Sequence, residues 1–408
     1  MFPAVSLLTT LLLALSIAGS LVEVDTSPIT LPIARRLNVS KGTTNLLQSD
    51  KARVAALKGS QTGSIPVIND AAGYIAAVGV GSPAKTYNLI VDTGSSNTWV
   101  GATTPYVKTS TSVNTGQPVS VIYGSGSFSG MAYNDIIRTE YTDTVTLGKG
   151  LIITKQSIGV ASSSTSFTNV DGILGIGPED LTLGSLIKSP AKTIPTITEN
   201  LFSQGTISQK VVSVSFRPTT SQETTNGELT FGGTDATKYI GSIAYTPITT
   251  TKPASTYWGI NESITYGSTT ILSSTAGIVD TGTTFLYIAT DAYTKYQSAT
   301  GATVDSTTGL LVVSSAKYNA LKNLNFNIGS ETYVLTPNAQ IWPRSLNTHI
   351  GGSSTAIYLI VNDIGTPSGQ GMDFVNGYTF LERFYSVFDT ANSRVGFAKT
   401  SYTDATTN

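Results

Sequence analysis

Residues 88–99 read Asn-Leu-Ile-Val-Asp-Thr-Gly-Ser-Ser-Asn-Thr-Trp, and residues 276–284 read Ala-Gly-Ile-Val-Asp-Thr-Gly-Thr-Thr. In each stretch an apolar run of strand length leads into an aspartate and a tight Thr-Gly turn. The glycine lets backbone N–H groups approach the carboxylate closely. A single Asp-Thr-Gly triplet is typical of an ordinary turn. Two copies, each preceded by Ile-Val and followed by hydroxyl residues, predict instead that Asp92 and Asp280 meet and share one proton.

The composition indicates an all-β chain in which carboxylates are the main reactive groups. The 408 residues include 39 Gly and 16 Pro, and only 12% are charged, which is typical of many short strands and turns. There is no Cys and one His, His349, so disulfides, thiol nucleophiles, Cys-ligated metals and His-rich metal sites are excluded. The single His leaves at most one Ser-His-Asp triad. No basic run indicates nucleic-acid binding.

Residues 1–20 are predicted to be a secretory signal peptide. An apolar segment from Val5 to Ala18 ends in small residues at Ser16, Ala18 and Ser20, as before a small-x-small cleavage site. A membrane span is the alternative, but four hydroxyl residues interrupt a segment that is already short for spanning. We therefore expect a secreted, extracellular protein without membrane attachment.

Residues 21–64 are predicted to be a prosegment, a part of the precursor that is cut away to give the mature protein. They hold six basic residues against three acidic ones, which leaves 18 basic against 22 acidic in residues 65–408. A basic segment is attracted to an acidic body, and the attraction weakens when the body's carboxylates protonate. A helix is predicted over 50–58, with Val54 and Leu57 on one face, before an easily cut Ser/Gly-rich stretch. The alternative is an ordinary N-terminal arm.

The rest of the chain is predicted to be mostly β-strand. Hairpins are expected over 74–91 and 142–160, and short helices over 195–204, 291–298 and 316–324. Residues 79–84 superficially match a dinucleotide-binding fingerprint. Pro83 and the strand pattern after it exclude the helix which that motif needs.

The two halves of the chain echo one another. Ile173-Leu174-Gly175 follows the Asp92 stretch and Val375-Asn376-Gly377 follows the Asp280 stretch, each after a long β excursion. Each triplet is expected to form a strand against the loop of its aspartate. The repeat predicts two β lobes, residues 65–240 and 241–408, related by a pseudo-two-fold axis with the site in the cleft between them.

A close pair of carboxyls supplies what peptide hydrolysis needs when metal, thiol and histidine are missing. Like charges at short distance cannot both ionise easily, so one carboxyl stays protonated and polarises the scissile carbonyl. The other, ionised, takes a proton from the attacking water. Such a pair titrates jointly, and we expect activity at acid pH.

These motifs together resemble the pepsin-like (A1) family of aspartic proteases, in particular its secreted fungal, cysteine-free members. The resemblance extends over nearly the whole chain and is carried by residues 92–99, 280–284, 123–127, 171–175, 388–390 and 394–398. It implies an all-β, bilobal double β-barrel with pseudo-two-fold symmetry and a few short helices. It also implies an endopeptidase made as a zymogen, without cofactor or metal.

The resemblance assigns roles to individual residues. Asp92 and Asp280 would be the catalytic dyad. Active-site support would come from the hydroxyls of Thr93 and Thr281, each bonding across to the opposite loop, the N–H groups of Gly94 and Gly282, which face the carboxylates, and the hydroxyls of Ser95 and Thr283, which lie on the outer oxygens.

A β-hairpin flap in the first lobe would close over the substrate and exclude water. Tyr123 would sit on it with Gly124 and Ser125, its hydroxyl bonding the indole N–H of Trp99. Ile173, Tyr123 and Phe128 would line an apolar subsite, although ordinary core packing is the alternative for them. Some fungal relatives carry aspartate at the position of Ser125, linked with acceptance of lysine, so we expect a mainly hydrophobic preference.

Two departures from the family pattern are notable. Asn376 stands where an apolar residue usually precedes the glycine, and local repacking is expected there. Thr98 replaces the usual leucine before Trp99. Asn261-Glu262-Ser263 is an N-glycosylation sequon, meaningful in a secreted chain.

The expected partners are polypeptide substrates and the chain's own propeptide, acting as an intramolecular inhibitor. No nucleic acid or membrane is expected, and the protein should be a monomer. Two other functions remain open at this point: a binding protein on the same fold that has lost catalysis, and a two-carboxylate glycosidase, which would need acids spaced for a sugar bond.

Overall fold

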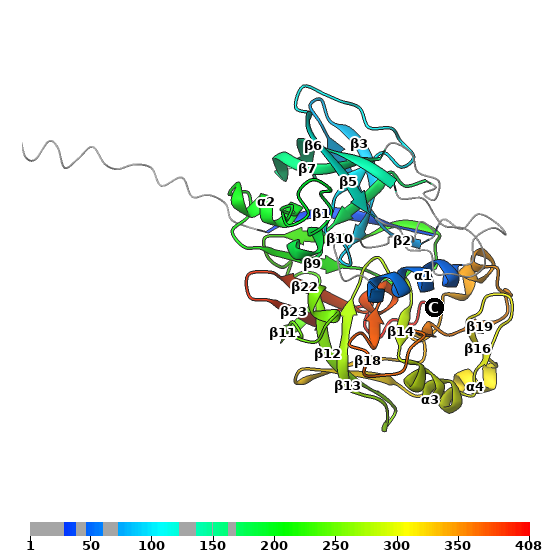
Figure 1. Ribbon diagram of the computed structural model, residues 1–408. Helices are drawn as coiled ribbons and strands as arrows, with labels where there is room; N and C mark the ends of the chain where they lie inside the picture. Colours follow the sequence, from blue (N-terminus) through cyan, green and yellow to red (C-terminus); the bar gives the residue numbers. More distant parts are fainter. Residues whose placement is uncertain (1–27, 38–45, 60–71, 122–135, 149, 162–168) are drawn as a thin grey trace, which may run out of the picture.

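The computed structural model describes residues 28–37, 46–59, 72–121, 136–148, 150–161 and 169–408. Strands dominate these residues, and they form one large sheet, one medium sheet and one small sheet. The predicted all-β class with two lobes is therefore confirmed (Figure 1).

The large sheet has thirteen strands. In spatial order they are β11 (Ile240–Pro247), β23 (Arg394–Lys399), β22 (Phe384–Asp389), β9 (Val211–Ser215), β10 (Glu223–Phe231), β1 (Ile29–Leu37), β2 (Ala72–Val80), β3 (Lys85–Asp92), β8 (Gly172–Gly175), β4 (Trp99–Val100), β7 (Ile152–Ala161), β6 (Ile136–Thr146) and β5 (Val113–Val121). The sheet carries strands from both sides of residue 240, so it joins the two halves of the chain.

The other two sheets belong to the second half of the chain. The medium sheet consists of β18 (Glu331–Leu335), β17 (Leu324–Ile328), β12 (Gly259–Tyr266), β13 (Thr269–Val279), β21 (Phe374–Asn376), β14 (Leu286–Ile288) and β20 (Val361–Asp363), and the small one of β15 (Thr303–Val304), β16 (Leu311–Val313) and β19 (Ile357–Tyr358). The helices are α1 (Leu46–Gly59), α2 (Ile197–Ser203), α3 (Thr290–Thr300), α4 (Ser315–Asn319) and α5 (Tyr378–Leu381), with 3₁₀ turns η1 (Glu179–Thr182), η2 (Ala254–Thr256) and η3 (Arg344–Ile350).

The predicted hairpins and most of the predicted helices are confirmed. β2 pairs with β3 and β6 pairs with β7, both antiparallel. The helix expected over 316–324 ends at Asn319, because the alternating apolar residues from Leu324 onward form β17 instead. The helix expected over 50–58 is α1, which begins earlier, at Leu46.

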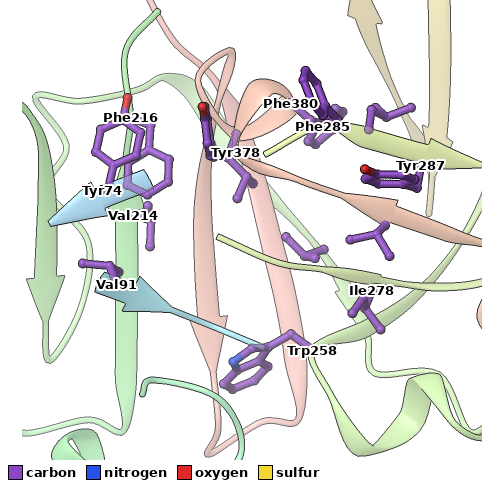
Figure 2. Packing of buried hydrophobic residues seen from close by; sticks show 14 of the residues in the cluster. Tyr74, Val91, Val214, Phe216, Trp258, Ile278, Phe285, Tyr287, Tyr378 and Phe380 are labelled. Carbon is purple, nitrogen blue, oxygen red and sulfur yellow. The ribbon is translucent and has the colours of Figure 1, made fainter. Parts of the chain in front are cut away.

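The core is built mainly from aromatic and branched side chains of both halves. Tyr74 of β2 stacks face to face on Phe216, with ring centroids 3.5 Å apart and planes 2° apart (Figure 2). The indole N–H of the buried Trp258 donates to the carbonyl of Ile176 at 3.1 Å, which ties the second half of the chain to the first.

Two parallel strand pairs repeat the same arrangement in the two halves. β3 runs parallel to β8, with Asp92 opposite Gly175, and β13 runs parallel to β21, with Val279 opposite Asn376. Both apolar-x-Gly triplets thus lie beside the strand that leads into an aspartate, as predicted. The N-terminal elements β1 and α1 are docked on this framework, and α1 lies between the cyan strands and the yellow to orange elements (Figure 1).

Candidate active site

The two aspartates stand at the ends of buried strands and face one another. β3 ends at Asp92, and Asp280 directly follows β13. Both side chains are completely buried. A Cβ atom on Gly94 would lie 2.7 Å from Oδ1 of Asp280, and one on Gly282 would lie 2.6 Å from Oδ1 of Asp92. Only glycine permits this approach of each turn to the opposite carboxylate.

Each carboxylate is held by its own turn in the same way. The N–H of Gly94 donates to Oδ1 of Asp92 at 2.9 Å, and the Ser95 hydroxyl donates to Oδ2. In the second half, the N–H of Gly282 donates to Oδ1 of Asp280 at 3.0 Å. The Thr283 hydroxyl donates to Oδ2 of Asp280 at 2.5 Å. Two polar groups of its own turn, one N–H and one hydroxyl, therefore hold each carboxylate before any ligand is considered.

The two threonines after the aspartates lock the turns together. The Thr93 N–H donates to the Thr281 hydroxyl oxygen, and the Thr281 N–H donates to the Thr93 hydroxyl oxygen, both at 2.9 Å. The Thr93 hydroxyl then donates to the carbonyl of Val279 at 3.2 Å, and the Thr281 hydroxyl to that of Val91 at 2.9 Å. All four bonds are buried, and they cross the junction between the halves.

The residue that joins the two carboxylates is Arg53 of helix α1. Its Nη2 donates to Oδ1 of Asp92 at 2.6 Å and to Oδ1 of Asp280 at 2.9 Å. Its Nε donates to Oδ2 of Asp280 at 2.8 Å. The guanidinium therefore contacts both aspartates through a single nitrogen, and Asp280 through two nitrogens. All three side chains are fully buried.

The charge of Arg53 separates the pKa values of the two acids. Burial raises the pKa of Asp92, and the Arg53 charge offsets this effect only in part. Burial also opposes ionisation of Asp280, but the charge and hydrogen bonds of Arg53 outweigh it and hold the pKa of Asp280 below its ordinary value. The difference follows from the two-nitrogen contact to Asp280.

Helix α1 makes further contacts along the second half of the chain. Asp50 accepts hydrogen bonds from the N–H groups of Thr284 at 2.8 Å and Phe285 at 2.9 Å, although its burial raises its pKa to about 7. The Tyr257 hydroxyl donates to the carbonyl of Leu57 at 2.9 Å, and the Lys58 ammonium donates to the Thr366 hydroxyl. Specific hydrogen bonds thus hold α1 on the second half of the chain, in addition to the attraction between its basic residues and acidic groups.

A cavity of about 370 Å³ remains beside α1. It is lined by Lys51, Val54, Ala55, Lys58, Tyr287, Asp363, Ile364, Gly365 and Thr366. Its walls therefore come from α1 on one side and from β14, β20 and the chain after β20 on the other.

The other residues singled out from the sequence are distributed as follows. Trp99 and Ile173 are buried together in a satellite cluster, and Ile173 lies on β8, the strand parallel to the one that ends at Asp92. Asn261 has an exposed side chain on β12. The flap residues Tyr123, Gly124 and Ser125, and with them Phe128, lie outside the described residues.

Arg53 is the site residue that sequence reasoning missed. In the sequence it is one of six basic residues in the predicted prosegment, with nothing local that links it to the aspartates. A usable signal was present, because Asp50 and Arg53 fall at helical spacing within the buried stripe of Leu46, Val54 and Leu57. Two charged residues on the apolar face of a short helix indicate polar partners in the surface that the helix covers.

Comparisons with known proteins agree with this geometry. The family model described as eukaryotic aspartyl protease matches residues 73–400. Polyporopepsin of Irpex lacteus is 63% identical over 85% of this chain and 99% of that protein. Cathepsin E of Rattus norvegicus is 31% identical over 80% of this chain and 79% of that protein. Pepsin A of Sus scrofa is 30% identical over 80% of each.

Among solved structures, the crystal structure of the aspartic proteinase from Irpex lacteus matches with a TM-score of 0.80 and 56% identity, covering 94% of this chain and all of that one. The resemblance predicted from the motifs and its double-lobed fold are therefore confirmed. The chain belongs to the eukaryotic aspartyl protease family and is an aspartic endopeptidase of the pepsin type.

Proposed function

We propose that Asp92 and Asp280 are the catalytic dyad of this endopeptidase and hydrolyse peptide bonds through an activated water. The observation that carries the proposal is the convergence of both carboxylates on one nitrogen of Arg53. A site that holds two carboxylates around one guanidinium nitrogen can hold them around one water when the guanidinium has left.

In the proposed reaction the dyad begins with one proton. The ionised carboxylate takes a proton from water while the water oxygen attacks the scissile carbonyl carbon, and the protonated carboxyl gives its proton to the carbonyl oxygen. The carboxylate that gave its proton then takes one from a hydroxyl of the tetrahedral diol, the other carboxyl gives its proton to the leaving nitrogen, and the C–N bond breaks, which leaves the dyad with one proton again. The turn N–H groups and the crossed threonines hold both acids in place throughout, which keeps the reacting atoms aligned.

The described chain is, in our proposal, the zymogen. Helix α1 places Arg53 where the attacking water would lie, and both aspartates are fully buried beneath it. A substrate peptide cannot reach the dyad while this helix is docked. The propeptide is thus an intramolecular inhibitor, and its inhibition rests on a cation bound by both catalytic groups.

Acid would release this inhibitor because the groups that bind Arg53 lose their charge. The docked pKa of Asp280 is lower than its ordinary value, so its ion pair with Arg53 stabilises docking above the ordinary pKa of an aspartate. That contribution is lost as the pH falls through the lowered pKa. Arg53 itself keeps its charge at every relevant pH, so the switch resides in the aspartates.

The sequence is the basis for the secretion, the processing and the substrates that we propose. Residues 1–20 would direct secretion, and residues 21–64 would be removed after it. Among the residues that the structure describes, no helix is long and apolar enough to cross a membrane. Substrates would be extended polypeptides with hydrophobic residues at the cleaved bond. Ile173 itself is packed in a buried cluster with Trp99.

The test is cleavage of an unfolded protein by the acid-treated chain, with sites read by mass spectrometry. Asp92→Asn and Asp280→Asn should each lower kcat by at least about 10²-fold, because each removes a proton acceptor or donor of the reaction. The surface variant Asp404→Asn should cleave at the parent rate, since Asp404 is exposed. A folded Asp92→Asn or Asp280→Asn chain that turns over substrate normally would exclude the dyad.

A further inference from the structure

Behind Asp280 lies a buried carboxyl that the reaction does not use. Glu262 of β12 is 1% exposed, and its Oε2 accepts a hydrogen bond from Nδ2 of Asn376 at 2.8 Å. Within the described part of the chain, its other oxygen, Oε1, has no hydrogen-bond partner, and neither has Oδ1 of Asn376. Both atoms are buried acceptors, which native proteins rarely leave without a donor.

One proton would satisfy both of these oxygens. If Glu262 were ionised, Oε1 and the Asn376 Oδ1 would both be acceptors, and the buried charge would have no cation. If Oε1 carries a proton, it can donate to Oδ1 of Asn376, while Nδ2 donates to Oε2 as observed. The result is a closed ring of two hydrogen bonds between a carboxylic acid and a carboxamide.

Among the residues that the structure describes, the elements around Glu262 carry no cation that would stabilise its anion. Strands β13, β17 and β21 and the turn η2, which pack around β12 or lie beside it in the sheet, carry no Asp, Glu, Lys, Arg or His. On β12 itself the other titratable group is Tyr266. Burial raises the pKa of Glu262 to about 8, and the single hydrogen bond from Asn376 lowers it only in part.

Asn376 connects this pair to the active site. Its carbonyl accepts the N–H of Asp280 at 3.1 Å. The next residue, Gly377, packs so tightly on the same turn that a Cβ there would lie 2.6 Å from the carbonyl of Thr283. The position of Asn376 therefore decides where the Asp280 turn lies.

The first half of the chain has an apolar pair at the same two places. Leu174 lies opposite Val91, one residue before Asp92, as Asn376 lies opposite Val279, one residue before Asp280. Val78 lies opposite Tyr87, five residues before Asp92, as Glu262 lies opposite Thr275, five residues before Asp280. A buried Val/Leu pair in one half thus corresponds to a Glu/Asn pair in the other.

We propose that Glu262 is a positioning residue that remains protonated while the enzyme works and, paired with Asn376, holds the strand behind Asp280. This inference rests on the proposed role of Asp280. The Glu262–Asn376 pair would hold the strand behind Asp280 at low pH, because its two hydrogen bonds are intact there. They are broken when Glu262 ionises. An ordinary Glu has a pKa of 4.5, so between that value and about 8 the folded chain keeps a proton that the unfolded chain has lost. Stability therefore falls as the pH rises through this window.

The test uses Glu262→Gln, which can form the same two hydrogen bonds with Asn376 but cannot titrate. Thermal unfolding is followed across pH 4.5 to 8 in the full-length Asp92→Asn background, which prevents self-cleavage. The melting temperature of the Glu262 chain should fall by about 5–10 °C more over this range than that of the Glu262→Gln chain. The infrared difference between the two chains should contain a carboxylic-acid C=O band at acid pH.

Activity supplies the positioning readout, measured in the chain with both aspartates. Glu262→Ala should lower kcat about tenfold with little change in KM, and Glu262→Gln should restore it, because only the latter keeps Asn376 in place. The double variant Glu262→Val, Asn376→Leu copies the pair of the first half and should also restore kcat.

Equal pH dependence of unfolding in the Glu262 and Glu262→Gln chains, or no rescue of kcat by glutamine, would overturn the proposal. Self-cleavage of the Asp92→Asn chain would instead count against the dyad, and the unfolding and infrared results would still decide on Glu262.

Discussion

Replacing Arg53 by methionine should produce a precursor that is active without acid treatment. The methionine side chain retains apolar bulk but removes the cation that bridges Asp92 and Asp280. Removing one partner of a fully buried ion pair costs about 3–5 kcal/mol, because the remaining charge is left without compensation. Arg53 and both aspartates are fully buried, so solvent does not weaken their ion pairs and the full cost of about 3–5 kcal/mol applies.

This loss falls on the docked state of α1, because the aspartates regain water when the helix leaves. A change of about 3 kcal/mol or more raises the undocked fraction at least about 10²-fold. The assay is cleavage of a quenched fluorescent peptide by the freshly purified precursor at weakly acidic pH, without prior acidification. The Arg53→Met precursor should show a rate at least about 10²-fold above the parent precursor, and it should mature at higher pH.

Two variants separate this effect from a general change of charge. Arg36→Gln removes a basic residue of the same proposed prosegment, but Arg36 pairs with Glu223 on the surface, where an ion pair contributes little. It should leave the precursor inert. Arg53→Lys keeps the charge without the two-nitrogen contact to Asp280 and should lie between parent and Arg53→Met. A silent Arg53→Met precursor that matures at the parent pH would refute the reasoning.

Two further expectations concern the frame of the site and its surface. Thr281→Val should lower the free energy of unfolding by about 1–3 kcal/mol in chemical denaturation, because the carbonyl of Val91 and the N–H of Thr93 lose a buried partner; an unchanged midpoint would mean that the crossed bonds are dispensable. Asn261 has an exposed side chain, so a chain secreted by a eukaryotic host should carry a glycan there. The glycan should be seen as a mass difference from Asn261→Gln that vanishes after enzymatic deglycosylation, and equal masses would show that the sequon is unused.

The parts of the site set by neighbouring residues were the ones that the sequence could predict. In the turn from Asp92 to Ser95, a glycine N–H and a hydroxyl reach a carboxylate two or three residues away, so the local pattern determines the contact. Arg53 could not be found in this way, because it lies 227 residues from Asp280 and its position depends on how a whole helix docks. The net charges of residues 21–64 and 65–408 indicated that the two segments attract one another. They did not indicate that Arg53 is the cation that contacts Asp92 and Asp280.

The partner of Asn376 also depends on a contact between residues far apart in the sequence. Its presence in place of an apolar residue was visible in the sequence, and local repacking was the expectation. The structure instead gives it a polar partner, Glu262, from a strand 114 residues away. A buried carboxamide must find a hydrogen-bonding partner, but the sequence does not say which distant strand supplies it.

The place of β1 inside the large sheet has a consequence for maturation. β1 is hydrogen-bonded along both edges, to β10 and to β2, and its Arg35 is buried against Glu382 with Nε and Oε1 3.3 Å apart. Cleavage of the chain after α1 would therefore leave a nicked molecule. Its amino-terminal fragment would still be hydrogen-bonded in the sheet through β1. Lifting the helix off the dyad needs only protons, whereas peeling out a central strand exposes Leu31 and Ile33 and opens two rows of backbone groups at once. Undocking of α1 can be rapid and reversible, whereas loss of β1 from the sheet is slow and irreversible. Activity should therefore appear at a different rate from release of the amino-terminal fragment.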